Sequence, residues 1–311
     1  GTISVNPIKS KSWINHGFIS LNSQKPALQD FFDNHFAVQA KPFVKWVGGK
    51  RQLLEQFHDL YPQDFNPVEN KYFEPFVGGG AVFFDLQPYR ATLSDWNFEL
   101  IMTYKVIRDN VEELIKDLKT HKYEKEYFLK VRSKNPSRLS PLKIASRFIY
   151  LNKTCFNGMY RVNKSGGFNV PFGRYTNPKI CDEVNLRNVS RLLQNVEIER
   201  RGYDEVLKYA KTGDFIYFDP PYYPVSKTSS FTSYNSDAFL EKEQRELRDV
   251  FFELHKRGCF VMLSNSDTPF IREIYGKLGS DIKIQTVQAG RNINSKSSGR
   301  GKVSEVVVVN Y

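Results

Sequence analysis

The sequence contains few cysteines and no long hydrophobic run. Three cysteines, Cys155, Cys181 and Cys259, are scattered over 311 residues. They are too few for a disulfide framework or a zinc site, so we expect a reducing compartment and no bound metal. No apolar segment approaches the length of a membrane span, and the first residues lack the charged-then-apolar order of a secretory signal. We therefore predict a soluble protein of the cytoplasm.

Acidic residues are also in deficit. The chain has 34 Asp and Glu against 45 Lys and Arg, a formal charge of +11. This excess favours a polyanionic partner, and nucleic acid fits better than a membrane surface because no basic amphipathic helix or lipidation signal is present. Ordinary solubility charge is the alternative explanation. The length is enough for a sizeable core in one large or two smaller domains.

The most informative stretch is residues 212–222. Residues 215–218 form a short apolar run, entered through a Gly-Asp turn and stopped by two prolines, which predicts a buried strand. The strand delivers Asp219 to its carboxyl end, where ligands bind in an open α/β sheet. Pro220 and Pro221 carry no N–H, so the oxygen acceptors here have no donor in their own turn. An ordinary Asp-Pro turn after a strand is the alternative.

An exocyclic amine of a nucleobase matches these acceptors. Its two N–H bonds fit the Asp219 carboxylate and the Pro220 carbonyl, while Tyr222 stacks on the ring. Two acceptors would draw the nitrogen toward tetrahedral geometry and free its lone pair to attack a methyl donor. The segment therefore predicts methyl transfer to an amine without a covalent intermediate.

Two glycine-containing turns precede this stretch. Trp46 leads through Gly48, Gly49 and Lys50 into a helix predicted at residues 51–60. The upstream glycine of a nucleotide-triphosphate loop and the Ser or Thr after its lysine are absent, which excludes that motif. Residues 72–84 form a strand, a glycine turn and a helix, the layout of a cofactor-binding first βα unit.

A second predicted strand, residues 91–94, ends in Asp95. An acid at this place can accept hydrogen bonds from ribose hydroxyls, and Trp96 beside it can pack on an adenine ring. The structural alternatives are a helix-capping aspartate and, in the preceding turn, glycines needed for positive φ.

These features, in this order, resemble the Dam/DpnM-type DNA adenine-N6 methyltransferases, the D12 class of class α amino-methyltransferases. The resemblance covers residues 42–311. It implies an α/β fold: a Rossmann-like, seven-stranded S-adenosylmethionine-dependent methyltransferase sheet with an inserted, mostly helical target-recognition domain that carries a β-hairpin. The implied domains are residues 41–100 with 195–311 for catalysis and 101–194 for target recognition, after an N-terminal arm, residues 1–40, of unknown role.

The resemblance also implies the site residues. The catalytic set is Asp219, Pro220, Pro221 and Tyr222. The residues expected to bind S-adenosyl-L-methionine are Trp46, Gly48, Gly49, Lys50, Glu74, Pro75, Phe76, Gly78, Asp95, Trp96, Tyr203, Asp204 and Asp219. One position departs from the family pattern: an acid common before the aromatic residue is Gly202 here, and Asp204 is its candidate substitute.

Residues 157–175 predict a β-hairpin that turns at 164–167. Arg on such a ribbon prefers guanine and Asn prefers adenine in the major groove, although a polar hairpin is more often a solvated loop. In the resembled family the matching hairpin reads GATC. The DNA contacts expected from the hairpin are Tyr160, Arg161, Asn163, Lys164, Asn169, Pro171 and Arg174. A basic loop at 290–302 adds Lys296 and Arg300, and Lys45 is expected as a further contact.

The predicted strands number seven, with residues 282–287 and 303–309 as a final antiparallel pair. The expected function is methylation of adenine N6 in double-stranded DNA, at GATC, on a base rotated out of the helix. Methylation of cytosine N4 or of RNA adenine, and a non-catalytic DNA-binding module, are the alternatives. We expect a monomer from a bacterium or phage, associated with the nucleoid; a cognate restriction endonuclease without direct contact is left open.

Overall fold

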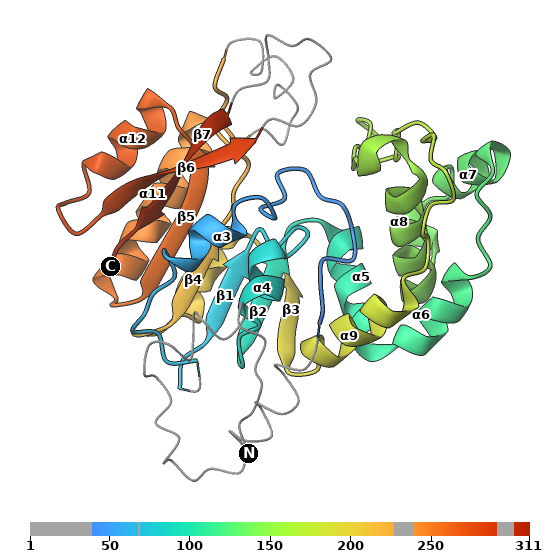
Figure 1. Cartoon of the computed structure of the whole chain (residues 1–311), viewed down its shortest axis with the longest axis horizontal. Coiled ribbons are helices and arrows are strands. Elements are labelled where there is room, and N and C mark those ends of the chain that lie inside the picture. Colours follow the sequence, from blue (N-terminus) through green and yellow to red (C-terminus); the bar gives the residue numbers. More distant parts are fainter. Residues whose placement is uncertain (1–38, 68, 227–238, 291–301) are drawn as a thin grey trace.

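The computed structural model describes residues 39–67, 69–226, 239–290 and 302–311. The N-terminal arm up to residue 38, and the predicted DNA contacts Lys296 and Arg300, lie outside these described residues. In Figure 1 the chain forms a sheet with helices on both sides and a second, mostly helical lobe beside it.

The centre of the fold is one seven-stranded sheet of order β3-β2-β1-β4-β5-β7-β6. β1 to β5 run parallel, and β7 is antiparallel to both β5 and β6. The predicted seven strands and the final antiparallel pair are therefore confirmed. The strands are β1 Tyr72–Pro75, β2 Ala91–Asp95, β3 Val196–Arg200, β4 Phe215–Phe218, β5 Phe260–Ser266, β6 Lys283–Gly290 and β7 Lys302–Val309.

β4 is the middle strand, and its four residues are all buried. Phe215 and Tyr217 belong to one hydrophobic core and Ile216 and Phe218 to another. Successive side chains of a strand point to opposite faces, and this sheet is covered on both faces, so the strand has a continuous apolar run instead of an alternating one.

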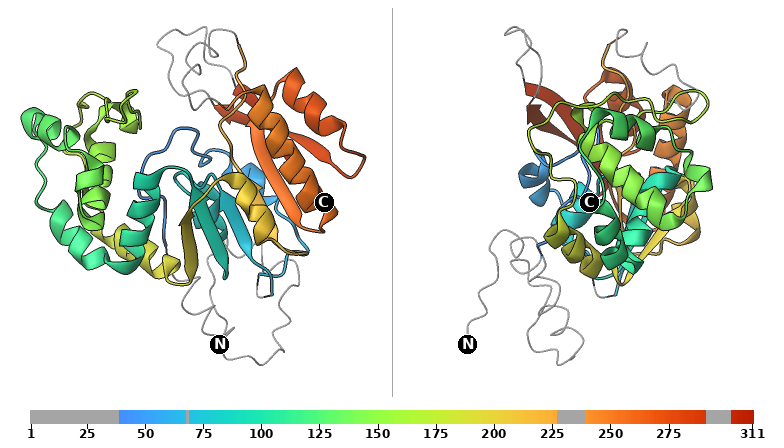
Figure 2. Two further views of the ribbon diagram at one scale, coloured as in Figure 1. Left: turned by 180° about the vertical axis from the view of Figure 1, so that it is seen from behind. Right: turned by 90° about the vertical axis from the view of Figure 1, so that its right-hand side faces the viewer.

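Helices cover the two faces of the sheet (Figure 2). The core that holds Tyr217 includes residues of α3 and α4, and the core that holds Phe218 includes residues of α11 and α12. α3 is shorter than the helix predicted at residues 51–60. The bounds are α3 Leu54–His58, α4 Ala81–Leu86, α11 Glu241–Lys256 and α12 Pro269–Gly276, with a 3-10 turn η3 at Tyr203–Lys208.

The second lobe is built mainly from the chain between β2 and β3. Its elements are α5 Phe98–Asp109, α6 Val111–Leu118, α7 Lys125–Arg132, η1 Pro136–Arg138, α8 Pro141–Thr154, η2 Phe156–Gly158 and α9 Glu183–Leu193. Buried residues of α5, α6 and α9 share the core of the sheet, and a smaller core joins α7, α8 and the hairpin. The expected domain boundary after residue 100 falls inside α5, so the two parts of the molecule are joined by common packing.

The predicted hairpin is present at the tip of this lobe. Val162 pairs with Phe168 in an isolated antiparallel bridge, and the Asn163 N–H donates to the Gly167 carbonyl over 2.8 Å. The Asn163 side chain closes the turn, because its Oδ1 accepts from the N–H of Ser165 (3.0 Å) and of Gly167 (2.8 Å). The hairpin is therefore short and held by side-chain bonds, without a long strand ladder.

Candidate active site

The predicted catalytic and cofactor residues meet at one edge of the sheet. β1, β2 and β4 are parallel neighbours, so their carboxyl ends lie together. These ends carry Glu74, Asp95 and Asp219 respectively. Open α/β sheets bind ligands in the crevice beyond the carboxyl ends of their parallel strands. These three carboxyl groups therefore lie at the edge of the sheet where a ligand is expected.

Asp219 is paired with a lysine. The Lys50 Nζ lies 3.1 Å from Asp219 Oδ1, donates to the Gly48 carbonyl over 2.6 Å, and lies 4.3 Å from the centroid of the Tyr222 ring. The Lys50 side chain is only 4% exposed. Burial raises the pKa of Asp219 to about 6, and the charge of Lys50 opposes that rise. The carboxylate is therefore mostly ionised at neutral pH, as an acceptor must be.

The Asp-Pro-Pro-Tyr turn is fixed by residues that the sequence reasoning missed. The Gln244 Nε2 donates to the Pro221 carbonyl over 2.9 Å, and its Oε1 accepts from Asn265 Nδ2 over 3.0 Å. The Tyr222 hydroxyl donates to Glu305 Oε2 over 2.8 Å. The sequence could have indicated Glu305, because it is a lone acidic residue near the start of an apolar strand. Gln244 lies within a highly charged helix, and nothing in the sequence distinguishes it from its neighbours.

The carbonyl of Pro220 has a different environment from that of Pro221. No donor to the Pro220 oxygen is found among the described residues. A buried acceptor without a donor is available for a ligand N–H. Among the described residues the turn is thus anchored at its second proline, whereas the oxygen of Pro220, the residue next to Asp219, has no bonded partner.

The glycine turn after β1 is shaped by Trp46. Gly78 has φ of +50°, and a Cβ there would lie 2.6 Å from Trp46 Cδ1. The Gly78 N–H donates to Asp95 Oδ2 over 3.1 Å, and its carbonyl accepts from the Tyr104 hydroxyl over 2.9 Å. Because neither the backbone conformation nor the space admits a side chain, the glycine is required for this approach.

The two acids beside this turn are largely withdrawn from water. Asp95 Oδ1 also accepts from the Asn97 N–H over 2.9 Å, and burial raises the pKa of Asp95. Glu74 is 2% exposed and accepts from the Tyr72 hydroxyl over 2.8 Å. Burial raises the pKa of Glu74 to about 8, so its carboxyl group is mostly protonated at neutral pH.

The aromatic residues of the predicted cofactor set have distinct surroundings. Phe76 stacks on Tyr203, with ring centroids 5.3 Å apart. Trp96 is 68% exposed, and the guanidinium of Arg200 covers its ring at 4.8 Å from the centroid. Phe76 and Tyr203 thus form one aromatic surface, and Trp96 forms a separate one with a cation on its ring.

Asp204 lies close to the position where the family pattern has an acid. A Cβ placed on Gly202 would be 2.9 Å from Asp204 Oδ1. The carboxylate of Asp204 therefore occupies the space where a side chain at 202 would begin.

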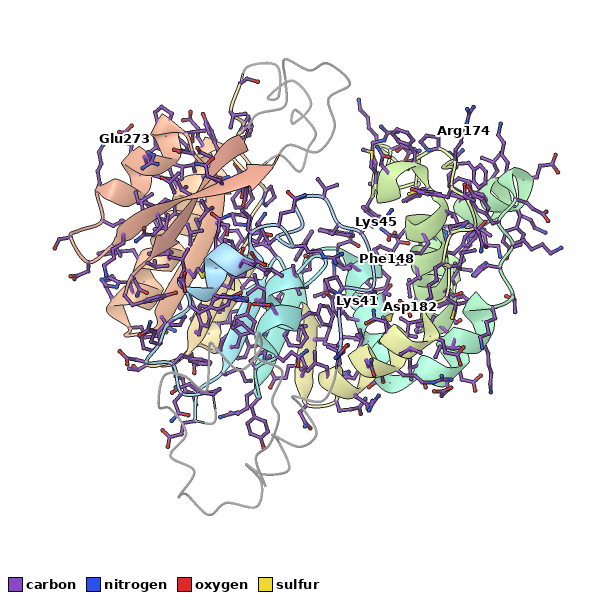
Figure 3. All side chains as sticks on the ribbon, viewed as in Figure 1. Lys41, Lys45, Phe148, Arg174, Asp182 and Glu273 are labelled. Atoms are coloured by element: carbon purple, nitrogen blue, oxygen red, sulfur yellow. The ribbon has the colours of Figure 1, made fainter. Side chains whose placement is uncertain are left out.

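The predicted DNA contacts of the second lobe are mostly on its surface. Lys45 and Arg174 are exposed, and Figure 3 shows Arg174 at the tip of the lobe and Lys45 beside the gap between the two lobes. Arg161 and Asn169 already bond to each other, from Nε to Oδ1 over 2.7 Å. Lys164 and Pro171 are exposed as well.

Tyr160 is the exception in this set, because its hydroxyl and ring are used inside the protein. The hydroxyl donates to Glu99 Oε2 over 2.8 Å, and the ring stacks on Trp46 at 5.8 Å between centroids. Asn163 is exposed, but its amide oxygen is occupied by the hairpin turn.

Neither a metal-binding cluster nor a membrane-spanning helix is found among the described residues. They contain no group of three His, Cys, Asp or Glu side chains arranged to hold a metal ion. Within the same residues, no helix combines the length and apolar character needed to cross a bilayer.

Comparison with known proteins identifies the chemistry. The family model of D12 class N6 adenine-specific DNA methyltransferases matches residues 46–293. The chain belongs to this family. It is similar to the Type II methyltransferase M1.LlaDCHI of Lactococcus lactis subsp. cremoris, at 44% identity over 88% of this chain and 96% of that protein. It is also similar to the Type II methyltransferase M.MjaIII of Methanocaldococcus jannaschii, at 44% identity over 88% of this chain and 100% of that protein.

A more distant relative carries the name of the reaction itself. The DNA adenine methylase of Escherichia coli K12 is 32% identical over 86% of this chain and 95% of that protein. The chain is therefore a DNA adenine-N6 methyltransferase, and use of S-adenosyl-L-methionine follows from that family in general. The expected family, fold class and enzyme class are confirmed, and the family's description, N6 adenine-specific DNA methyltransferase, names neither cytosine N4 nor RNA adenine as a substrate.

Proposed function

We propose that this methyltransferase acts on the adenine of GATC after rotating that base out of the duplex. The observation that carries the proposal is the pair of acceptors at the end of β4: the ionised Asp219 carboxylate and the Pro220 carbonyl, next to the Tyr222 ring. An adenine in a base-paired stack cannot reach such a site, so the amine has to leave the helix.

The residues at the strand ends fit S-adenosyl-L-methionine. The Asp95 and Asp219 carboxyl groups at this edge suit a cationic sulfonium and the hydroxyl and amino groups of the ligand. The mostly protonated Glu74 beside them is available as a neutral hydrogen-bonding group. The Gly78 turn approaches the Trp46 indole so closely that no side chain fits between them, which holds both predicted cofactor contacts together. When bound, the cofactor supplies an electrophilic methyl group.

The chain's own residues then orient the amine. The Asp219 carboxylate and the Pro220 carbonyl each accept a hydrogen bond from one N–H of the N6 amino group. The Lys50 ammonium favours the ionised form of the carboxylate. Tyr222, whose hydroxyl is tied to Glu305, offers its ring to the base. Both acceptors favour a tetrahedral nitrogen, which leaves the lone pair directed at the methyl group.

Sequence recognition is assigned to the hairpin. Arg161 and Asn169 are the side-chain types that read guanine and adenine, and the exposed Lys45, Lys164 and Arg174 supply positive charge for phosphates or bases. The mutual bond of Arg161 and Asn169 has to open for both to read bases. Since two relatives carry the name Type II methyltransferase, we extend the proposal to a role beside a restriction endonuclease in the cytoplasm.

Transfer of tritium from labelled S-adenosyl-L-methionine to duplex DNA tests the chemistry. We expect Asp219→Ala to abolish transfer while cofactor binding survives at least in part; full activity in this variant would contradict the mechanism. The exposed Asp109, which pairs with its neighbour Arg108, gives the matched control Asp109→Ala, which should keep full transfer.

Site specificity and base rotation need separate measurements. A duplex with one GATC should accept the label, and the same duplex with that site permuted should not. With 2-aminopurine at the target position, enzyme binding should raise the fluorescence, because the base leaves the stack. Transfer to the permuted duplex would rule out GATC, and unchanged fluorescence would rule out rotation.

A further inference from the structure

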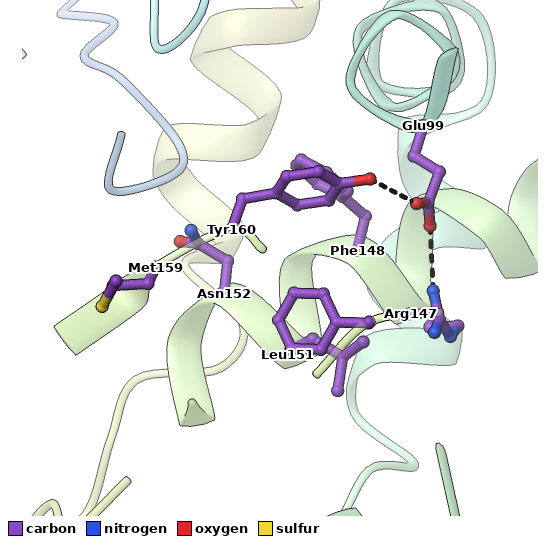
Figure 4. Close-up of a pocket in the computed structure, with 8 residues that line it drawn as sticks. Glu99, Arg147, Phe148, Leu151, Asn152, Met159 and Tyr160 are labelled. Carbon is purple, nitrogen blue, oxygen red and sulfur yellow. Dashed lines mark hydrogen bonds and ion pairs between the residues drawn. The ribbon is translucent and has the colours of Figure 1, made fainter. Parts of the chain in front are cut away.

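Tyr160 lies between the DNA-recognition hairpin and the cofactor site. Its ring stacks on Trp46, with 5.8 Å between centroids and 28° between planes. Its hydroxyl donates to Glu99 Oε2 over 2.8 Å, as the dashed line in Figure 4 marks. The hairpin residue that follows it, Arg161, is exposed. One residue of the hairpin is thus anchored inward while the next faces outward.

The partner of Tyr160 in the stack is a residue of the cofactor site. The indole of Trp46 would be 2.6 Å from a Cβ on Gly78 and its own Cβ 3.1 Å from one on Gly79. Trp46 is therefore packed against the glycine turn through one part of its surface and against Tyr160 through another. Any displacement of the turn that moves this indole also moves the hairpin ring.

The hydroxyl of Tyr160 makes a second connection to the same site. Glu99 is buried in the first turn of α5, whose N-cap is Asn97. The Asn97 N–H donates to Asp95 Oδ1, and Asp95 Oδ2 accepts from the Gly78 N–H. The acid that holds the hairpin tyrosine is therefore carried by the helix that starts directly after the predicted ribose-binding aspartate.

Glu99 also connects to the other arm of the hairpin. Its Oε1 is paired with Arg147 Nη1 at 2.9 Å. Arg147 donates in addition to the carbonyl of Arg132 over 2.9 Å, and Arg132 donates to the carbonyl of Val170 over 3.2 Å. Tyr160 and Val170 stand on the two arms, so both are tied to one buried carboxylate.

The region between these groups is tightly packed. The cavity lined by Glu99, Arg147, Phe148 and Tyr160 has a volume of about 10 Å³, room for about one water molecule. It is too small for a ligand, and close-packed interiors transmit displacement. By contrast, the hairpin's own pairing consists of isolated bridges. Its position therefore depends on contacts with the rest of the lobe: those of Tyr160 with Trp46 and Glu99, and those of Phe168 and Val170 in the smaller core.

We propose that Tyr160 is a positioning residue that couples cofactor binding to DNA recognition. A cofactor seated against Trp46 and Asp95 fixes the stack and the Glu99 bond, which holds the hairpin in its DNA-reading position. Coupling of two binding equilibria is reciprocal, so DNA in turn favours the cofactor-bound arrangement. This inference rests on the proposed function, because it takes the hairpin as the DNA reader and Trp46 as a cofactor contact.

The test measures a ratio of affinities. The dissociation constant of a duplex with one GATC is determined with and without saturating S-adenosyl-L-homocysteine, a probe with no methyl group to transfer. In the unaltered protein we expect the probe to tighten DNA binding about fivefold or more. Tyr160→Phe, which keeps the ring and loses only the bond to Glu99, should reduce this factor to below about twofold. A residue that only contacted DNA would weaken both constants equally and leave the ratio unchanged.

A second buried tyrosine of the same lobe provides the control. Tyr150 donates its hydroxyl to the Lys122 carbonyl over 2.7 Å, and its ring contacts are with His121, Tyr127 and Phe128 instead of Trp46. Tyr150→Phe loses a comparable hydrogen bond, and we expect the probe to tighten DNA binding by this variant as much as it does for the unaltered protein. Equal loss in both variants, or an unchanged factor in Tyr160→Phe, would overturn the coupling. Tyr160→Leu, which also removes the stack, should abolish the factor, and its unfolding midpoint checks that the lobe still folds.

Failure of the proposed function is separately visible. If the unaltered protein does not methylate GATC in duplex DNA, the proposed specificity fails whatever the ratio is. If it methylates GATC but the probe leaves the DNA affinity unchanged, only the coupling fails.

Discussion

Lys50 and Asp219 form an ion pair at the end of the middle strand, with 3.1 Å between Nζ and Oδ1. Lys50 comes from the glycine turn near the start of the described chain and Asp219 from the Asp-Pro-Pro-Tyr turn far along it. The pair therefore connects two motifs that lie far apart in the sequence, one expected to bind the cofactor and the other expected both to bind it and to carry catalysis. It also gives the catalytic carboxylate a cation that favours its ionised form.

The first prediction concerns pH dependence. The pKa of Asp219 is about 6, and the charge of Lys50 is the largest influence that lowers it. Activity needs the ionised carboxylate, so kcat/KM should be lost as pH falls through about 6. Lys50→Gln removes the cation and raises the pKa of Asp219, so the acid limb should move to higher pH. The profile of kcat/KM between pH 5 and 9 measures this shift.

The control for that profile is a lysine remote from the site. Lys277 pairs with Glu273 on the surface of α12. Lys277→Gln should leave the acid limb in place. An unmoved limb in Lys50→Gln would mean that Asp219 does not set it.

The second prediction concerns the glycine turn. Gly78→Ala forces a side chain into a positive-φ position 2.6 Å from the Trp46 indole. We expect a loss of about 1–3 kcal/mol in the free energy of unfolding, since the conformation and the contact are both unfavourable for alanine. Cofactor affinity should fall with it because the indole is displaced. Thermal unfolding and calorimetric titration with S-adenosyl-L-homocysteine measure the two effects.

A glycine with free space serves as the comparison. A Cβ on Gly276, the last residue of α12, would have no heavy atom within 4 Å, and its φ is not positive. Gly276→Ala should be neutral or slightly stabilising. Equal behaviour of the two alanine variants would contradict the role given to Trp46.

The third prediction concerns the support of the catalytic turn. Gln244 is fully buried and bonds to both the Pro221 carbonyl and Asn265. Gln244→Ala leaves these groups without a partner, which costs about 1–3 kcal/mol for a buried polar group. Because the turn that carries Asp219 loses its anchor, kcat should fall more than cofactor affinity. Steady-state kinetics with duplex DNA and a binding titration separate the two quantities.

An exposed glutamine provides the reference for this variant. Gln56 donates to the Gln288 carbonyl on the surface. Gln56→Ala should keep kcat and most of the stability. If Gln244→Ala also keeps kcat, the turn does not depend on this anchor.

The fourth prediction concerns the departure at Gly202. The Asp204 carboxylate lies where an acid at 202 would begin, so we expect it to bind the adenine amine of the cofactor. Asp204→Asn should weaken cofactor affinity about fivefold, the contribution of one hydrogen bond. Glu205→Gln, which alters a neighbouring acid paired with Lys208, should not weaken it. Titration with S-adenosyl-L-homocysteine measures the cofactor affinity of both variants. An Asp204→Asn variant that binds as tightly as Glu205→Gln would exclude Asp204 as the contact of the adenine amine.

The sequence by itself determined that the fold has seven strands and where along the chain they lie, although several ends differ by a few residues from those predicted. Runs such as residues 215–218 are apolar without interruption because both faces of the sheet are covered, and the prolines after them fix where the strand stops. Motifs with their own backbone requirements, such as the turn at Gly78, are local and can be read from the chain.

The tertiary structure alone decided which side chains meet across the fold. Lys50 with Asp219, Tyr222 with Glu305 and Gln244 with Pro221 are joined by packing between distant segments. It also turned Tyr160 inward, where sequence had placed it toward DNA. No local sequence pattern encodes such pairs, because their members come from distant segments of the chain. The burial of Asp219 and Glu74, which raises the pKa of both groups, likewise depends on the segments that the whole chain brings to one edge of the sheet.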